Sequence, residues 1–187
     1  MAAALAVAVL AVGCDTVAPA AATGPAAVAT ALAVAVGGDC PAAMPSMPAA
    51  GGKGPGGQLV PQAEDRLVLC AYRPASAAAR APAWRDSPAL AARVQVGDPA
   101  AVARLRQAVD ALKGPPGGTF ACPAQHGYAV LEVFSDAAGT QVVETEQSLD
   151  GCQIVSSATT ERWVGASDAG VVLMSLLPDS YRQEAWH

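Results

Sequence analysis

Large side chains and positive charges are both scarce in this sequence. Aromatic residues make up 4% of its 187 residues, and 11 Lys and Arg stand against 16 Asp and Glu. The net charge of −5 argues against nucleic acid as a partner, because phosphates must be neutralised by a basic face. It argues equally against binding anionic lipid head groups through a basic patch. The mean hydropathy of +0.32 is inflated by alanine, so we expect a thin core.

The chain is long enough for one ordinary domain. No Lys or Arg precedes Lys53, and the residues before it are mostly Ala, Val, Gly, Pro and Thr. Such a segment has too few large apolar side chains to build its own core. We therefore expect a signal peptide at residues 1–13, a low-complexity tether at 14–57 and a single folded domain at 58–187.

The first residues indicate export. Ala2 to Val12 form an apolar run of the length of a signal sequence, which is too short to span a bilayer. The run ends in Ala11-Val12-Gly13-Cys14, which resembles the lipobox of bacterial lipoproteins. In a lipobox, small residues precede a cysteine that is lipidated and becomes the mature N-terminus. We therefore expect Cys14 to carry a lipid that holds the protein at the extracellular face of the cell membrane.

Two alternatives to lipidation remain open. Ala11 stands where leucine is usual and no positive charge precedes the run, which also fits an ordinary secretory signal cut elsewhere. Cys14 would then be an ordinary thiol or be removed. The tract Val17 to Val36 is long enough to span a membrane, but Pro19 and Pro25 interrupt it.

The cysteine count predicts disulfides. Four cysteines follow Cys14, and an even number in an exported chain implies two bridges with three possible pairings. We favour Cys40–Cys70 and Cys122–Cys152, each of which closes a loop of about 30 residues and stabilises by roughly 3–4 kcal/mol.

A metal site is not expected. Cys122 and His126 are four residues apart, but there is no Cys-x-x-Cys motif, and the second of the two histidines is the terminal His187. We predict neither a metal nor any other cofactor.

The clearest helix lies between Gly97 and Gly114. Asp98 is a good N-cap, Pro99 follows at the first helical position, and Pro115 blocks continuation. Four apolar side chains fall within an arc of about 80°, which predicts a helix packed on an apolar surface. They are Val102, Leu105, Val109 and Leu112.

The remaining pattern predicts an α+β fold. β-Prone segments indicate about five strands, at residues 66–72, 93–96, 128–134, 141–147 and 152–156. Residues 74–92 are expected to form a surface loop. A second helix begins after Ser167 and ends before Pro178, with a polar tail beyond it. Antiparallel hairpins and two helices give a two-layer domain, with the helices on one face of the sheet.

No sequence motif for catalysis is present, and we predict no catalytic residue. Glu144 and Glu146 share one face of a strand, and Glu132 across the hairpin is a candidate partner for an acid pair. We favour the alternative that all three lie on the solvated face of a half-buried sheet. His126 follows Cys122-Pro123 in a loop, where a histidine is usually exposed and inert.

Two tryptophans are candidates for binding a partner protein. Trp84 lies between Arg80 and Arg85 in the long loop, and Trp163 follows Arg162. Tryptophan beside arginine is common at the centre of protein interfaces. The alternative is that both rings pack locally over a thin core.

The segment from Leu67 to Pro178 carries a recurring pattern. It has a strand ending in Cys70-Ala71-Tyr72, the helix after Asp98, Cys122-Pro123 before a hairpin and Gly151-Cys152 after it. In this pattern the chain resembles a family of exported actinobacterial proteins of unknown function. The resemblance implies export and disulfides but no assigned activity.

A shorter resemblance covers Thr119 to Val155. Its Cys-Pro loop, two strands and closing cysteine are similar to the C-terminal half of the Streptomyces subtilisin-inhibitor family. In that family the residues after Cys-Pro bind the protease, with a scissile-like bond that here is Ala124–Gln125. The residues so implicated are Ala124, Gln125 and His126. The family's first disulfide, however, is not matched by Cys40 and Cys70.

Three functions follow from these observations. The one we favour is a non-catalytic cell-envelope lipoprotein that binds an envelope or extracellular protein, with no nucleic acid and no membrane contact beyond the lipid. The alternative is a secreted protease inhibitor that uses the Cys122-Pro123 loop. The third is an envelope hydrolase that uses Glu132 or His126.

Lipidation predicts how the protein partitions. Replacing Cys14 with alanine should release the protein to the medium or leave an uncleaved precursor, since no thiol remains to carry the lipid. Detergent partitioning of both forms measures this, and identical partitioning would rule out the lipobox.

Overall fold

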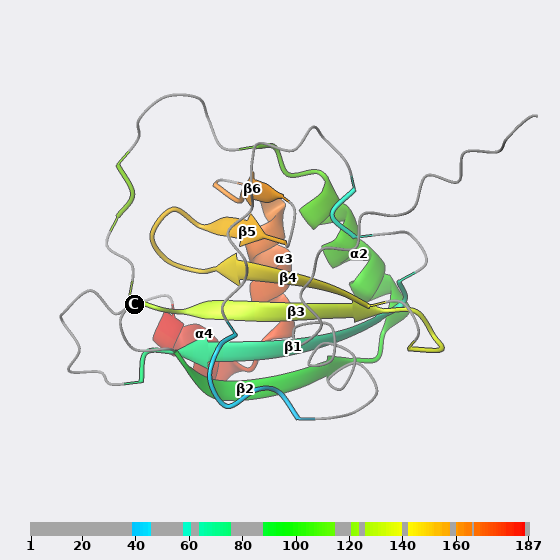
Figure 1. Ribbon diagram of the computed structural model, residues 1–187, viewed down its shortest axis with the longest axis horizontal. Helices are drawn as coiled ribbons and strands as arrows, with labels where there is room; N and C mark the ends of the chain where they lie inside the picture. Colours follow the sequence, from blue (N-terminus) through cyan, green and yellow to red (C-terminus); the bar gives the residue numbers. More distant parts are fainter. Residues whose placement is uncertain are drawn as a thin grey trace, which may run out of the picture.

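A computed structural model describes residues 39–45, 58–60, 64–75, 88–114, 121–123, 126–139, 142–157, 160–165 and 167–185. An antiparallel sheet forms one layer and helices on one of its faces form the other (Figure 1). The strands are β1 (Arg66–Arg73), β2 (Ala89–Val96), β3 (Ala129–Ser135), β4 (Val142–Ser148), β5 (Ile154–Ser156) and β6 (Glu161–Trp163). The helices are α2 (Pro99–Asp110), α3 (Asp168–Leu176) and α4 (Asp179–Ala185).

The sheet is ordered β2-β1-β3-β4-β5-β6, and every neighbouring pair is antiparallel. β1 and β3 lie inside the sheet, and side chains on both of their faces are buried. This explains why Arg66 to Tyr72 reads as apolar at almost every position rather than alternating. The α+β class, the two-layer arrangement and the two disulfides confirm the prediction from sequence.

Helix α2 covers the β1 side of the core. Asp98 caps it through an Oδ1 atom that accepts a hydrogen bond from Ala100 N at 3.0 Å, as the sequence predicts. All four predicted apolar side chains are buried against the sheet in one cluster with Leu67 and Leu69 of β1 and Leu173 of α3. Asp110 adds a polar attachment, because its Oδ1 accepts hydrogen bonds from Leu59 N and Val60 N.

The opposite face of the sheet has its own small apolar cluster. Cys70 of β1 forms the predicted disulfide with Cys40, which brings residues 39–45 across this face (Figure 1). The Tyr72 hydroxyl donates a hydrogen bond to Pro41 O at 3.1 Å, and Ala43 bridges to the start of β2. The disulfide therefore attaches residues 39–45, which lie within the expected tether at 14–57, to the folded sheet.

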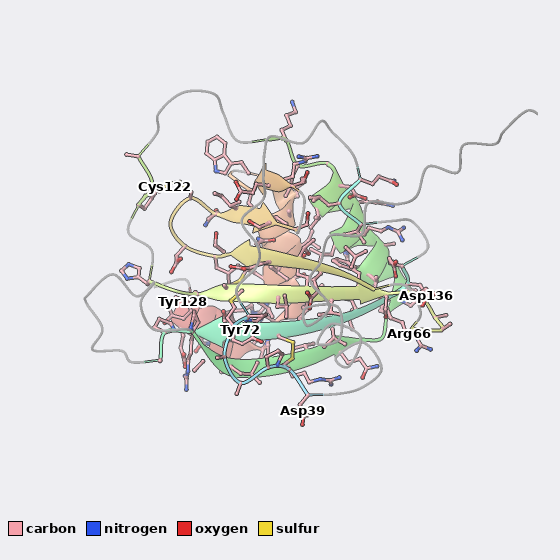
Figure 2. The ribbon with its side chains drawn as sticks, in the orientation of Figure 1. Asp39, Arg66, Tyr72, Cys122, Tyr128 and Asp136 are labelled. Atoms are coloured by element: carbon pink, nitrogen blue, oxygen red, sulfur yellow. A yellow bond between two sulfur atoms is a disulfide. The ribbon has the colours of Figure 1, made fainter. Side chains whose placement is uncertain are left out.

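Helix α4 closes one end of the sheet. Its Tyr181 hydroxyl lies 2.6 Å from Tyr72 O and 3.2 Å from Ala129 O, so it donates to the ends of both β1 and β3. The ring also packs edge-on against Tyr128, which lies at the same end as Tyr72 in Figure 2. Burial raises the pKa of Tyr181, so the hydroxyl remains a donor across the ordinary pH range.

One local prediction was wrong, and two short elements were not predicted. β2 begins at Ala89 rather than Arg93, so part of the expected loop is strand. The three-residue strand β6 and helix α4 were not predicted. In the described residues the sheet therefore has six strands rather than about five, with three helices rather than two. No helix in the described ranges is long and apolar enough to cross a membrane.

The packing of α2 predicts an unequal response to two substitutions. Leu105→Ala should lower the free energy of unfolding by about 2–4 kcal/mol, because it opens a cavity at a fully buried position. Gln107→Ala should have almost no effect, since this helix position is exposed. Urea unfolding with intact disulfides gives both values, and equal midpoints would contradict the packing.

Candidate functional site

The predicted site residues divide into two groups. Cys14, Trp84, Ala124 and Gln125 lie outside the described residues. Trp163, His126 and all four disulfide cysteines lie within them.

The Cys122-Pro123 loop is held at both ends. Cys122 forms the predicted disulfide with Cys152 in the turn between β4 and β5, with 4.9 Å between the Cα atoms. Asp150 in that turn accepts hydrogen bonds through Oδ2 from His126 N at 2.7 Å and from Tyr128 N at 3.2 Å. Cys122, Pro123 and His126 are exposed, and Figure 2 places Cys122 toward the Tyr128 end of the sheet.

Trp163 lies at a groove between α2 and α3. The groove has a volume of about 1170 Å³ and a mainly apolar lining. Its walls include Ala108 of α2 and Val171 and Val172 of α3. Trp163 is 39% exposed and Val171 is 64% exposed, and both line this groove. No other large hydrophobic side chain in the described part of the chain is exposed.

Local backbone contacts fix the position of Trp163. Its backbone N–H donates a hydrogen bond to Lys113 O at 2.8 Å, which joins β6 to the chain just after α2. Gly165 follows with φ +47°, a conformation that L side chains rarely adopt. A Cβ at Gly165 would lie 3.5 Å from the Trp163 ring, so the indole packs directly against this turn.

The groove carries more positive than negative charge. Arg104 and Lys113 line the α2 side, and Asp168 lies at the start of α3. All three are exposed. Two cations against one carboxylate in a chain of net charge −5 make this a locally basic surface.

The predicted position of Glu132 was wrong. It lies opposite Thr145 and Leu69, on the helix-covered face, and has no exposed surface. Glu144 and Glu146 do share a face, but it is the opposite one, so no acid pair forms with Glu132. The Thr145 hydroxyl donates a hydrogen bond to Glu132 Oε2 at 2.6 Å, whereas Oε1 has no hydrogen-bond partner.

Burial perturbs several carboxyls. It raises the pKa of Glu132 to about 7, and the Thr145 hydrogen bond opposes the rise. It raises the pKa of Glu144 to about 7 and also raises that of Glu146. The pKa of Glu64 rises to about 7, mainly by burial and then by the nearby Asp136 and Asp65.

Neither a metal centre nor a known relative accounts for these features. Among the described residues, no three His, Cys, Asp or Glu side chains are grouped to hold a metal ion. Comparison of the chain with family models, with curated proteins and with solved structures finds no match in any of the three. The candidate site therefore depends on the geometry of the groove alone.

The burial of Glu132 predicts a pH-dependent stability. The pKa of Glu132 is raised in the folded state, because burial favours the neutral form of its carboxyl group. The contribution of this group to the free energy of unfolding is therefore fully present below about pH 4.5 and is lost as the pH rises through about 7. Glu132→Gln keeps an acceptor for Thr145 and removes the ionisation. At pH 8 it should raise the free energy of unfolding by up to about 3.5 kcal/mol, at about 1.4 kcal/mol for each unit of the rise in pKa from 4.5 to about 7.

Thr145→Val is the matched control, because it removes the hydroxyl that stabilises the ionised carboxylate and should destabilise the protein at pH 8. Urea midpoints measured from pH 5 to pH 8 test both variants. A Glu132→Gln protein with the wild-type pH dependence would contradict the assignment.

Proposed function

We propose that this chain is a non-catalytic cell-envelope lipoprotein whose folded domain binds another exported protein in the groove between α2 and α3. Three features support export: the apolar N-terminal run, the lipobox-like sequence ending in Cys14, and two disulfides, which are typical of proteins that fold outside the cytosol.

One observation carries the binding function. The two large hydrophobic side chains exposed in the described part of the chain, Trp163 and Val171, line the same groove. Exposed apolar residues scattered singly need no explanation, whereas a contiguous apolar surface rimmed by polar residues is typical of an interaction site. Tryptophan is also among the residues that most often dominate binding energy.

The charge of the groove favours one kind of occupant. Arg104 and Lys113 lie beside the apolar floor, so a segment that combines apolar side chains with Asp or Glu complements both properties. An apolar segment with a basic flank would be repelled by Arg104 and Lys113. We therefore propose an acidic, amphipathic segment of a partner protein.

The fixed Cys122-Pro123 loop is the observation that favours the alternative, protease inhibition. Its disulfide and the two Asp150 hydrogen bonds restrain the backbone on both sides of Ala124 and Gln125. Such restraint reduces the entropy lost on binding. An inhibitor would bind the protease through this loop and would be insensitive to changes at Trp163.

A peptide-library selection tests the groove. Peptides selected on the immobilised chain should be rich in large apolar residues and in Asp or Glu. Trp163→Ala and Val171→Asp should each weaken their binding by roughly tenfold or more, because each removes an exposed apolar side chain from the groove lining. Arg93→Ala is the control, since Arg93 is exposed on the opposite face of the sheet.

Binding that survives both groove substitutions would contradict the proposal. Inhibition of subtilisin by the wild-type chain, retained in Trp163→Ala, would support the alternative instead.

A further inference from the structure

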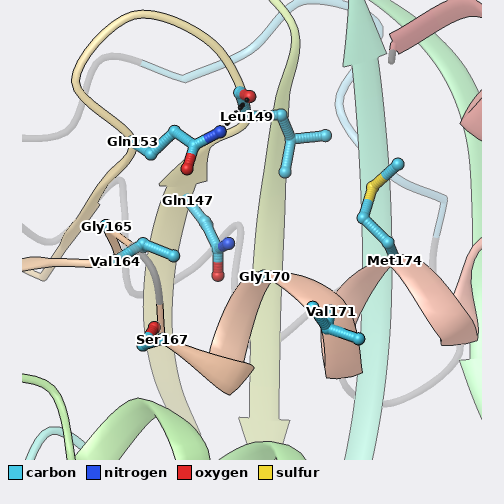
Figure 3. Close-up of a pocket in the computed structure, with 9 residues that line it drawn as sticks. All are labelled: Gln147, Leu149, Gln153, Val164, Gly165, Ser167, Gly170, Val171 and Met174. Atoms are coloured by element: carbon cyan, nitrogen blue, oxygen red, sulfur yellow. Dashed lines mark hydrogen bonds between the residues drawn. The ribbon is translucent and has the colours of Figure 1, made fainter.

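A second, smaller cavity adjoins the groove beside the start of α3. It is partly open to solvent, has a volume of about 220 Å³ and is lined by β4, the turn after it, the segment before α3 and α3 itself (Figure 3). Leu149, Val164 and Met174 give it apolar walls. Trp163 does not line it, although Val164, Gly165, Ser167 and Val171 border both this cavity and the groove.

Two polar groups in this cavity lack hydrogen-bond partners. Gln147 is 1% exposed, and its Oε1 accepts no hydrogen bond. Ser167 stands at the N-cap position of α3, but its hydroxyl makes no capping bond and is also without a partner. Gln153 at the same cavity differs, because its Nε2 donates to Leu149 O at 3.1 Å (Figure 3). Buried polar atoms are normally paired. Both oxygens are unpaired but have almost no accessible surface, so a ligand that bonds to them must displace side chains at the inner wall of the cavity.

A glycine keeps this space open. Gly170 lies within α3, where glycine is less favourable than alanine. A Cβ at this position would lie 3.4 Å from Val164 Cγ1 and 3.7 Å from Gln147 Nε2, which are ordinary contact distances. Alanine would therefore fit, but its methyl group would narrow the cavity beside the Gln147 amide.

The chemistry of the lining limits the ligand. None of the residues around the cavity is ionisable, so a charged molecule would lose its hydration without gaining a counter-charge. The apolar walls suit a hydrocarbon body. A cavity of roughly 150 Å³ is enough to hold a molecule the size of benzene, so a single substituted ring fits here.

We propose that this cavity binds a small uncharged molecule with an apolar body and a carboxamide-like group. The N–H of the ligand donates to Gln147 Oε1, and its carbonyl accepts from the Ser167 hydroxyl. The site adjoins the proposed protein-binding groove, with which it shares Ser167 and Val171, but Gln147 and Gly170 line this cavity alone.

Benzamide is a suitable probe, with ethylbenzene as the probe that lacks the amide. Titration of the ¹⁵N-labelled chain with benzamide should shift the Gln147 side-chain amide and the Gly170 backbone amide. Gln147→Leu should weaken benzamide binding by tenfold or more and leave ethylbenzene binding unchanged or stronger. Trp163→Ala should leave benzamide binding unchanged, which separates this site from the groove.

Gly170→Ala gives a second test with opposite effects on two quantities. It should raise the midpoint of thermal unfolding, yet weaken benzamide binding several-fold because the cavity narrows. If benzamide causes no chemical-shift change at Gln147 or Gly170 up to its solubility limit, the proposal is overturned, because the cavity then holds only water. Equal benzamide affinity in wild type and Gln147→Leu would also overturn it.

Discussion

Burial of one face of the sheet by two short helices is the interaction on which this fold depends. β1 and β3 present Leu67, Leu69 and Phe134 to the helices, and α2 and α3 cover them with Leu105 and Leu173. With so few aromatic residues, these aliphatic contacts supply most of the apolar burial that stabilises the domain. α2 and α3 lie side by side on this face (Figure 1), and the groove opens along their line of contact.

Polar groups inside this thin core have a cost that the apolar contacts must offset. Glu132, Thr145 and Gln147 are buried on the helix-covered face, where an unpaired polar atom costs about 1–3 kcal/mol. The Thr145 hydrogen bond satisfies one oxygen of Glu132, and protonation relieves the charge. The Oε1 atom of Gln147 has no hydrogen-bond partner within the protein. Its cavity therefore holds an unpaired polar atom, which an ordinary apolar packing defect does not.

The sequence predicted what local signals specify. Asp98, Pro99 and the spacing of the apolar side chains were enough for α2, and two pairs of cysteines at equal separation were enough for the disulfides. β6 has only three residues, too few for a recognisable alternation, and α4 is mostly polar with its burial concentrated in Tyr181. Glu132 was misplaced because a carboxylate in a strand normally marks the solvated face, and only the long-range packing of the helices shows otherwise. Trp163 was singled out by residue type, but the groove itself depends on how α2 and α3 pack together, which no local pattern encodes.

We propose that this protein binds its partner at the surface between α2 and α3. Chemical-shift mapping of the ¹⁵N-labelled chain with an acidic amphipathic peptide selected for binding tests it most directly. The account predicts that the largest shifts fall on Arg104 to Lys113 of the α2 region and on Trp163 to Val172, with little change at Arg93. Shifts centred on His126 and Cys122, or on the Arg93 face of the sheet, would contradict it.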